Sequence, residues 1–199
     1  MIHPKYININ RILGAMTFLI SFIVYFDTMA PSVSYWDCGE FIAVSYTLGV
    51  PHPPGSPLFL LLGRIASMLP ISEDIAFRVN LLSPLASAFS VLFLYFIIVQ
   101  LVNHWRGKIE TNTDALIAFG AGIVGSLTFA FTDSHWFNAV EAEVYAFSTF
   151  FTAIVVWLAL LWSEKSDEKG NERYILIIAY MIGLATGLHL LNLLTIPFV

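Results

Sequence analysis

Residues 77–102 read FRVNLLSPLASAFSVLFLYFIIVQLV, and this apolar stretch decides the fold class. As a helix rising about 1.5 Å per residue, it would span roughly 39 Å, more than the roughly 30 Å of hydrocarbon in a bilayer. The whole chain of 199 residues is 58% hydrophobic and only 12% charged. Water-soluble domains usually carry about 25% charged residues. The sequence therefore predicts a membrane protein and excludes a soluble globular enzyme.

Other apolar runs extend this pattern along the chain. The expected spans are Ile12–Ala30, Phe77–Val102, Ala115–Thr132, Tyr145–Trp162 and Tyr174–Leu188. A sixth apolar run, Leu190–Val199, ends with the last residue and has no polar segment to close it. We therefore expect an all-α, polytopic transmembrane helix bundle with about five spans and the start of a sixth. We expect residues 1–199 to be the N-terminal part of one domain in a longer protein.

The basic residues indicate the orientation in the membrane. Seven of the nine Lys and Arg residues lie before the first span or in the second and fourth connections. Because basic residues accumulate on the cytoplasmic side, we expect a cytoplasmic N-terminus. The outer connections are then residues 31–76 and 133–144, and the second of these is acidic. The net charge of −5 argues against a nucleic-acid partner.

The first outer connection is long enough to form a structure of its own. It contains the apolar run Leu58–Leu69, whose 12 residues would reach only about 18 Å as a helix and cannot cross a bilayer. We expect an interfacial or re-entrant segment in a partly helical outer loop. Arg64 within this run is expected to reach lipid headgroups or a carboxylate.

A pair of acids precedes this run. Asp37 and Glu40 are three residues apart and would share one face of a short helix. Two carboxylates this close repel each other, which suits an acid/base or a metal-binding pair. Alternatively, Asp37 caps the helix and Glu40 completes a capping box. Cys38 is expected only to pack, and the surrounding prolines are expected to hold His52 in a rigid segment.

The second outer connection offers two more acids. Glu141 and Glu143 would point about 200° apart on a helix, so both cannot face one cleft. We expect Glu143 to be functional because it lies nearer the membrane, and Glu141 to be solvated. His135 and His3 have no partners at a metal-ligand spacing and are expected to be surface histidines.

Arg78 and His189 lie near the ends of expected spans. Arg78 begins the second span and could bind an anionic headgroup or neutralise Asp37 or Glu40, because guanidinium groups pair with phosphate and carboxylate. His189 divides the fifth apolar run from the sixth. It could cap a turn or bind the same anion as Arg78.

Four motifs in order carry a family resemblance: WDCGEF at 36–41, LGVPHPPGSPL at 48–58, AEVYA at 142–146, and GLH at 187–189 leading to Pro197. They resemble a bacterial multi-spanning family that is similar to the transmembrane protein O-mannosyltransferases, within the GT-C superfamily of membrane glycosyltransferases. The resemblance implies a GT-C fold and inverting transfer of a sugar, mannose in this family, from a polyprenyl phosphate to Ser/Thr hydroxyls. It also implies a bacterial inner membrane and an active site on the periplasmic face.

The resemblance also implies roles for individual residues. Asp37 would be the general base, with Glu40 as the alternative, while Glu40 and Glu143 would orient hydroxyl groups. The negative charge of the leaving phosphate would be compensated by Arg78 with the help of His189. Further donor- or substrate-binding candidates are His52, Tyr145 and Arg64. The expected partners are the lipid-linked donor, an acceptor protein or peptide and the bilayer. No cofactor is implied, and no spacing is diagnostic of a metal, although the carboxylates could bind a divalent ion weakly.

Two other functions remain as alternatives. A transporter would need acids near the bilayer middle, whereas the acids here cluster at the outer surface. A non-catalytic membrane assembly subunit would retain the fold without the chemistry. Loss of transfer on changing Asp37 would separate this subunit from an enzyme.

Overall fold

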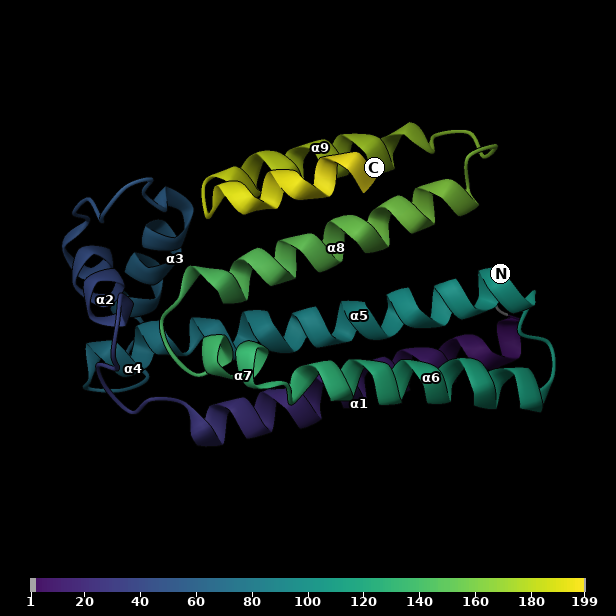
Figure 1. Cartoon of the computed structure of the whole chain (residues 1–199), viewed down its shortest axis with the longest axis horizontal. Coiled ribbons are helices and arrows are strands. Elements are labelled where there is room, and N and C mark those ends of the chain that lie inside the picture. Colours follow the sequence, from purple (N-terminus) through teal and green to yellow (C-terminus); the bar gives the residue numbers. More distant parts are fainter. Residues whose placement is uncertain (1–2, 199) are drawn as a thin grey trace.

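The computed structural model describes residues 3–198, which form helices and no β-strand (Figure 1). Four helices are long, and the others are short or cap one end of the bundle. The helices are α1 (Pro4–Thr28), α2 (Cys38–Thr47), α3 (Pro57–Met68), α4 (Ile75–Asn80), α5 (Leu82–Arg106), α6 (Asn112–Ala130), α7 (Asp133–Ala139), α8 (Val144–Glu164), α9 (Glu172–Thr186) and the 3₁₀ helix η1 (Leu190–Phe198). The expected all-α fold is confirmed.

Helix α5 is the centre of the bundle. It packs against α1, α6 and α8, which run roughly alongside it. Small buried residues on α5, among them Ala86, Ser87 and Ser90, allow this close approach. Gly122 of α6 is required for the same reason, since a Cβ there would lie 2.8 Å from the Tyr95 ring.

Four segments are long and apolar enough to cross a membrane: Pro4–Thr28, Ile75–Arg106, Asn112–Ala130 and Val144–Glu164. They correspond to the first four expected spans. The second of them is interrupted at Leu81, between α4 and α5. Pro84 explains this break, because its nitrogen has no hydrogen to donate to the carbonyl of Asn80 four residues earlier.

The expected count of about five spans is not confirmed. The fifth run forms α9, which has 15 residues and is about 22 Å long, shorter than the hydrocarbon core. The sixth run does not continue outward as a separate helix. It forms η1, which folds back beside α9 and α8. The amide of Asn192 in η1 holds this reversal by donating to the carbonyls of Ala185 and His189.

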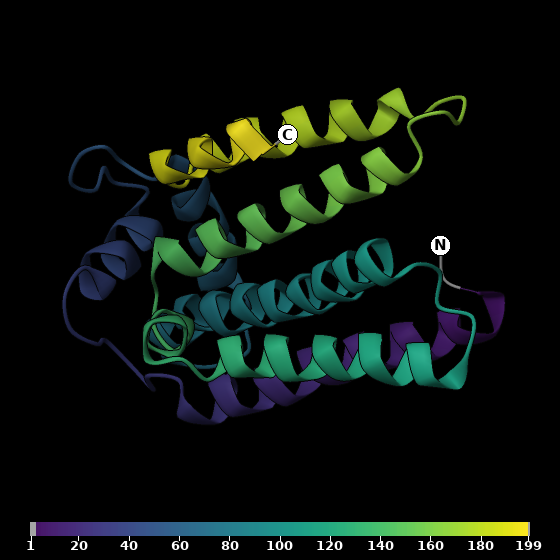
Figure 2. The same cartoon turned by 45° about the vertical axis from the view of Figure 1, so that its right-hand side comes forward.

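Helices α2, α3 and α4 lie together at one end of the long helices, with α7 beside the start of α8 (Figure 2). We call this the site end. The first outer connection is therefore partly helical, as expected, and its apolar run forms α3. A buried cluster including Phe41, Phe59, Val79 and Phe151 packs this region onto the bundle.

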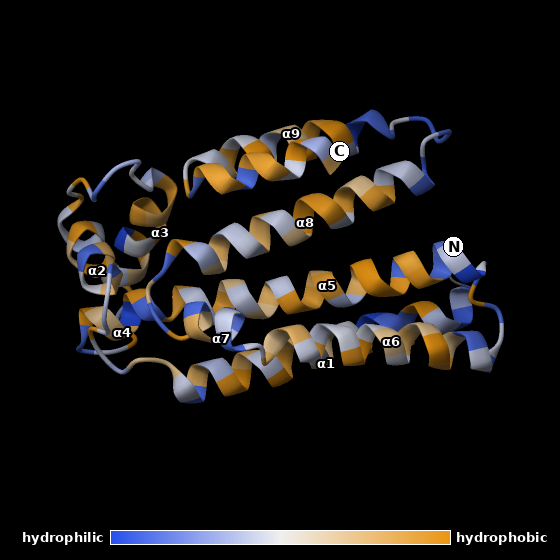
Figure 3. Cartoon of the chain, viewed as in Figure 1, coloured by the Kyte–Doolittle hydropathy of each residue, from blue (hydrophilic) through white to orange (hydrophobic). Residues whose placement is uncertain are grey.

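Hydropathy follows the same layout. Apolar residues occupy most of the length of the long helices, and hydrophilic residues gather toward the site end and toward the opposite end (Figure 3). The opposite end contains the N-terminus, the α5–α6 connection and the α8–α9 connection. This banding is what a bilayer requires, since only apolar side chains are stable beside lipid tails.

Candidate functional site

A small pocket opens at the site end, with a volume of about 40 Å³. It lies where α2, the connection before α3, the start of α8 and the turn after α9 meet. Five of the residues proposed from the sequence line it: Asp37, His52, Glu143, Tyr145 and His189. They come from three segments that are far apart in the chain, so the fold alone brings them together.

Asp37 stands at the mouth of this pocket. It occupies the N-cap position of α2 and is exposed, but its side chain makes no capping hydrogen bond. The capping-box alternative is therefore wrong, and the carboxylate is left free. The preceding Trp36 has a φ of 56°, a left-handed backbone conformation that bulky residues rarely adopt. Strain of this kind is found most often beside functional groups.

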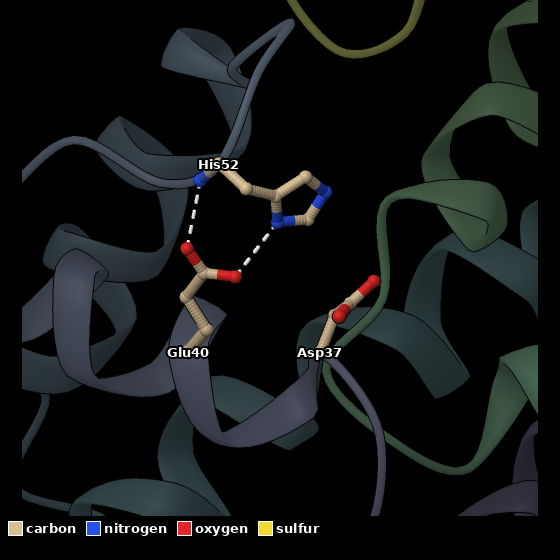
Figure 4. Close-up of side chains that lie close together, drawn as sticks. All are labelled: Asp37, Glu40 and His52. Atoms are coloured by element: carbon tan, nitrogen blue, oxygen red, sulfur yellow. Dashed lines mark hydrogen bonds and ion pairs between the residues drawn. The ribbon is translucent and has the colours of Figure 1, made fainter.

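Glu40 and His52 form a two-point contact (Figure 4). The His52 backbone N–H donates to Glu40 Oε1 over 2.7 Å, and His52 Nδ1 lies 2.7 Å from Glu40 Oε2. This hydrogen bonding lowers the pKa of Glu40 and raises the pKa of His52. The pair is therefore an ionised carboxylate holding a histidine that readily carries a proton.

Glu143 is the buried acid of the pocket. Its side chain is only 6% exposed, and one carboxylate oxygen accepts the N–H of Val144 at the start of α8. Burial, with the negative charges of Asp37 and Glu141, raises the pKa of Glu143 from 4.5 to about 7. Glu143 can therefore exchange a proton near neutral pH, which ordinary exposed glutamates cannot do.

Glu141 and His135 differ from expectation. Glu141 is 3% exposed and not solvated, and its Oε1 has no hydrogen-bond partner. The segment between α7 and α8 is a bend that packs inward, so helical spacing did not apply to it. His135 is also buried, against Phe129, and burial lowers its pKa to about 4. His3 is on the surface, as expected.

Asn80 is the hub that joins the segments of the site end. Its side chain is fully buried and donates to the carbonyls of Ala30 and Ser32. Its Oδ1 accepts the Ala142 backbone N–H at 3.0 Å and contacts the Cys38 thiol at 3.6 Å. Cys38 itself is fully buried, in agreement with a packing role. One buried amide thus positions both outer connections.

His189 reaches the pocket because the turn after α9 is hydrogen-bonded to the start of α3. The Ser56 hydroxyl donates to the Leu188 carbonyl at 2.9 Å, and the Leu58 N–H donates to the Gly187 carbonyl at 2.9 Å. The His189 ring then lies 5.3 Å from the ring of Tyr145. Ser56 also lines the pocket, and no sequence motif distinguished it from its neighbours.

The two arginines proposed from the sequence lie outside the pocket. Arg64 donates to the Tyr46 carbonyl, and Arg78 donates to the carbonyls of Ser67 and Ser72. Neither pairs with a carboxylate, so the alternatives in which Arg78 neutralises Asp37 or Glu40 and Arg64 meets a carboxylate are wrong. Backbone carbonyls near the ends of α2 and α3 and in the connection after α3 accept hydrogen bonds from these guanidinium groups instead.

Asp37, Glu40 and His52 are also the residues that could hold a metal ion. One potential ligand atom from each lies within 4.8 Å of the others. However, both Glu40 oxygens already contact His52, and all three groups reach solvent. Within this group, therefore, the Asp37 carboxylate is the one that makes no hydrogen bond to the other two residues.

Comparison with known proteins assigns the family. The family model described as the protein O-mannosyl-transferase TMEM260 N-terminal domain matches residues 37–199. This chain belongs to that family. The match includes every pocket residue, from Asp37 to His189. The resemblance to protein O-mannosyltransferases is therefore confirmed, whereas the expected bacterial family is not.

Two relatives illustrate the similarity. Protein O-mannosyl-transferase tmem260 of Dictyostelium discoideum is 31% identical over 198 residues, covering 92% of this chain and 22% of the relative. Protein O-mannosyl-transferase TMEM260 of Mus musculus is 29% identical over 162 residues, covering 81% of this chain and 21% of the relative. The chain thus spans about a fifth of the length of these relatives. No solved structure matches it significantly.

Proposed function

We propose that this chain forms part of the active site of a membrane protein O-mannosyltransferase of GT-C type. The enzyme would move mannose from a polyprenyl-phosphate donor to a Ser or Thr hydroxyl of an exported protein. The observation that carries the proposal is the single pocket in which Asp37, His52 and Glu143 meet. Membership in a family named for this activity supports it.

Asp37 is the general base in this proposal. Of the two acids on α2, Glu40 has both oxygens engaged by His52, whereas the Asp37 side chain has no capping bond and faces the pocket. The acceptor oxygen attacks the anomeric carbon while its proton passes to Asp37. The bond from that carbon to the phosphate oxygen breaks, and polyprenyl phosphate leaves with the electron pair.

The leaving phosphate needs positive charge near it. His52 is the best placed group, because Glu40 raises its pKa and holds Nδ1, leaving Nε2 free. His189 lines the same pocket from the other side. Arg64 and Arg78, proposed for this role from sequence, would have to leave their backbone partners to take part.

Glu143 is proposed to orient a sugar or acceptor hydroxyl together with Tyr145. Both residues lie at the start of α8 and line the pocket. The placement also fits the expected geometry of a lipid-linked donor, since α8 is one of the segments apolar enough to cross the membrane. The phosphate of such a donor would lie near the end of this helix, at headgroup level. In the orientation expected from the basic residues, this is the periplasmic face.

A transporter is less well supported. The clustered acids lie in α2 and in the α7–α8 connection, outside the four segments that could cross the membrane. A solute path would require such groups within those segments. A non-catalytic subunit would have the same fold, so only an assay of sugar transfer distinguishes it from an enzyme.

The test is transfer of labelled mannose from polyprenyl-phosphate mannose to Ser/Thr-containing protein. Full-length protein in membranes is compared with its Asp37→Asn variant, which keeps the side-chain size and removes the base. General-base loss is expected to reduce transfer by about 10²–10⁴-fold. The matched control is Asp133→Asn, an exposed acid at the same end that does not line the pocket.

Full transfer by a folded Asp37→Asn protein would overturn the assignment of the base. Absence of transfer by the folded wild type from every polyprenyl-phosphate sugar tried would overturn the enzyme proposal itself.

A further inference from the structure

A second cavity, of about 210 Å³, lies at the end of the bundle opposite the site end. It is lined by the start of α1 and by the last turns of α5 and α8, and it opens to the surface. Its volume is roughly seven times the ~30 Å³ that one water molecule takes up in the liquid. The cavity can therefore hold a polar group of several non-hydrogen atoms.

Opposite charges line this cavity without meeting. Arg11 comes from α1 and Glu164 from the end of α8. No ion pair joins them, and the ion pair found among residues 3–198 is that of Glu40 with His52. Both residues are exposed, so their charges are accessible to a group that carries both a negative and a positive charge.

Two amide side chains in the same cavity add unused hydrogen-bonding atoms. The Asn10 Oδ1 acceptor and the Gln100 Nε2 donor are both buried without a partner. Buried polar atoms are nearly always satisfied in native proteins, so a missing ligand is a natural explanation. The cavity thus offers one free donor and one free acceptor in addition to its cation and its anion.

The remaining wall is apolar and aromatic. Trp157 of α8 packs against Phe96 of α5, with ring centroids 6.1 Å apart, and both line the cavity. Because the cavity lies at the ends of helices that could cross a membrane, it is at headgroup level. Tryptophan is enriched at this depth, where one side of a group is apolar and the other is wet.

We infer that this cavity binds the headgroup of a phospholipid that carries a phosphate and a primary ammonium, as phosphatidylethanolamine does. The phosphate accepts hydrogen bonds from Arg11 and the Gln100 amide. The ammonium donates to Glu164 and to the Asn10 carbonyl oxygen. A choline headgroup has no N–H for Asn10, and a headgroup without an ammonium leaves Glu164 unpaired.

The experiment measures lipids retained by purified full-length protein. The protein in detergent is incubated with equal amounts of phosphatidylethanolamine, phosphatidylcholine and phosphatidylglycerol, and bound lipid is counted by native mass spectrometry. Phosphatidylethanolamine is expected to be retained about tenfold better than the other two. Arg11→Gln and Glu164→Gln are each expected to reduce its retention by about tenfold, the effect of losing one charge-assisted bond.

The controls are Lys108→Gln and Glu110→Gln, charged residues at the same end that do not line the cavity. Both are expected to retain lipid as the wild type does. Gln100→Leu leaves the charges intact and is expected to lower retention as well, which covers the case in which a charge variant fails to fold.

Equal retention of the three lipids would overturn the proposal. So would folded wild-type protein that retains none, since another part of the full-length chain would then fill the cavity. Because the readout is bound lipid, the result does not depend on whether the protein transfers a sugar.

Discussion

The two ends of the bundle both gather polar groups, but they treat these groups differently. At the site end, Glu40 is bonded to His52, and Asn80 uses its whole amide on the segments around it. At the opposite end, Arg11 and Glu164 face one cavity without an ion pair. The hydrogen bonds at the site end hold Glu40, His52 and the connections around them in place, which is the support that a reactive group such as Asp37 requires.

The largest effect is expected from removing the Asn80 side chain, which joins the segments of the site end. Asn80→Ala eliminates three hydrogen bonds and the thiol contact, and leaves the Ala142 N–H buried without a partner. We expect the free energy of unfolding to fall by about 2–4 kcal/mol. The measurement is the denaturation curve of the purified protein in detergent.

Asn138→Ala is the matched control for that change. The Asn138 amide bonds only to the Ser134 carbonyl of its own helix, so a loss below about 1 kcal/mol is expected. Equal losses of unfolding free energy in the two variants would show that Asn80 is not the hub.

A second prediction tests whether Glu40 keeps His52 protonated for the reaction. Glu40→Gln removes the carboxylate that raises the pKa of His52. We expect transfer at neutral pH to fall by about tenfold, less than for Asp37→Asn, since the base remains. The fall in activity at alkaline pH should move to lower pH, because His52 then loses its proton earlier.

The pH profile of transfer measures this change. Glu73→Gln, at an exposed acid outside the pocket, is the control and should keep the wild-type profile. A Glu40→Gln profile of unchanged shape would mean that His52 does not act as a cation in the reaction.

A third prediction concerns stability and the buried acid Glu143. The folded state holds the Glu143 proton up to about pH 7, whereas an ordinary glutamate loses it near 4.5. The folded state therefore binds more protons between these values, and stability should decrease as the pH rises from about 4.5 through 7. Glu143→Gln should remove this decrease and melt at a higher temperature than the wild type above pH 7.

Melting temperatures measured from pH 4 to pH 8 test whether stability decreases with rising pH. Asp133→Asn, which changes an exposed acid nearby, should leave the slope of the wild type intact. If the melting temperatures of Glu143→Gln and the wild type change with pH in parallel, Glu143 is not the source of the pH dependence.

The smallest effect is expected at the opposite end, where α6 begins with a capping box. The Thr111 hydroxyl accepts the Asp114 N–H at 3.2 Å, and the Asp114 side chain accepts the Thr111 N–H. Thr111→Ala should cost about 1 kcal/mol of stability. Transfer should be unchanged, because the site lies at the other end of the long helices.

Thr113→Ala, at an exposed threonine in the same turn, is the control and should be nearly neutral. Reduced transfer by a folded Thr111→Ala protein would show that the two ends are coupled.

Several features of the fold followed from sequence patterns alone. Long apolar runs predicted α1, α5, α6 and α8, because a bilayer admits only segments that satisfy their own backbone hydrogen bonds. The length of Leu58–Leu69 likewise predicted a helix too short to cross. Patterns near the end of the chain were less informative, because apolar composition does not distinguish a crossing helix from one folded back like η1.

The candidate site was predictable in part. Family motifs selected Asp37, His52 and Glu143, and the structure places the three residues around one pocket, while their roles stay predictions. Arg64 and Arg78 were misplaced because spacing does not show that nearby backbone carbonyls take up a guanidinium group. Glu141 was misplaced because helical spacing was applied to a bend.

By itself, the sequence determined the membrane class, the helical fold and the family, since these depend on composition, on the length of apolar runs and on local motifs. The tertiary structure decided which polar groups share a pocket. It also decided which acid on α2 is free, because His52 comes from a different segment and engages Glu40 rather than Asp37. Contacts between distant segments depend on how helices pack, and no local pattern encodes them.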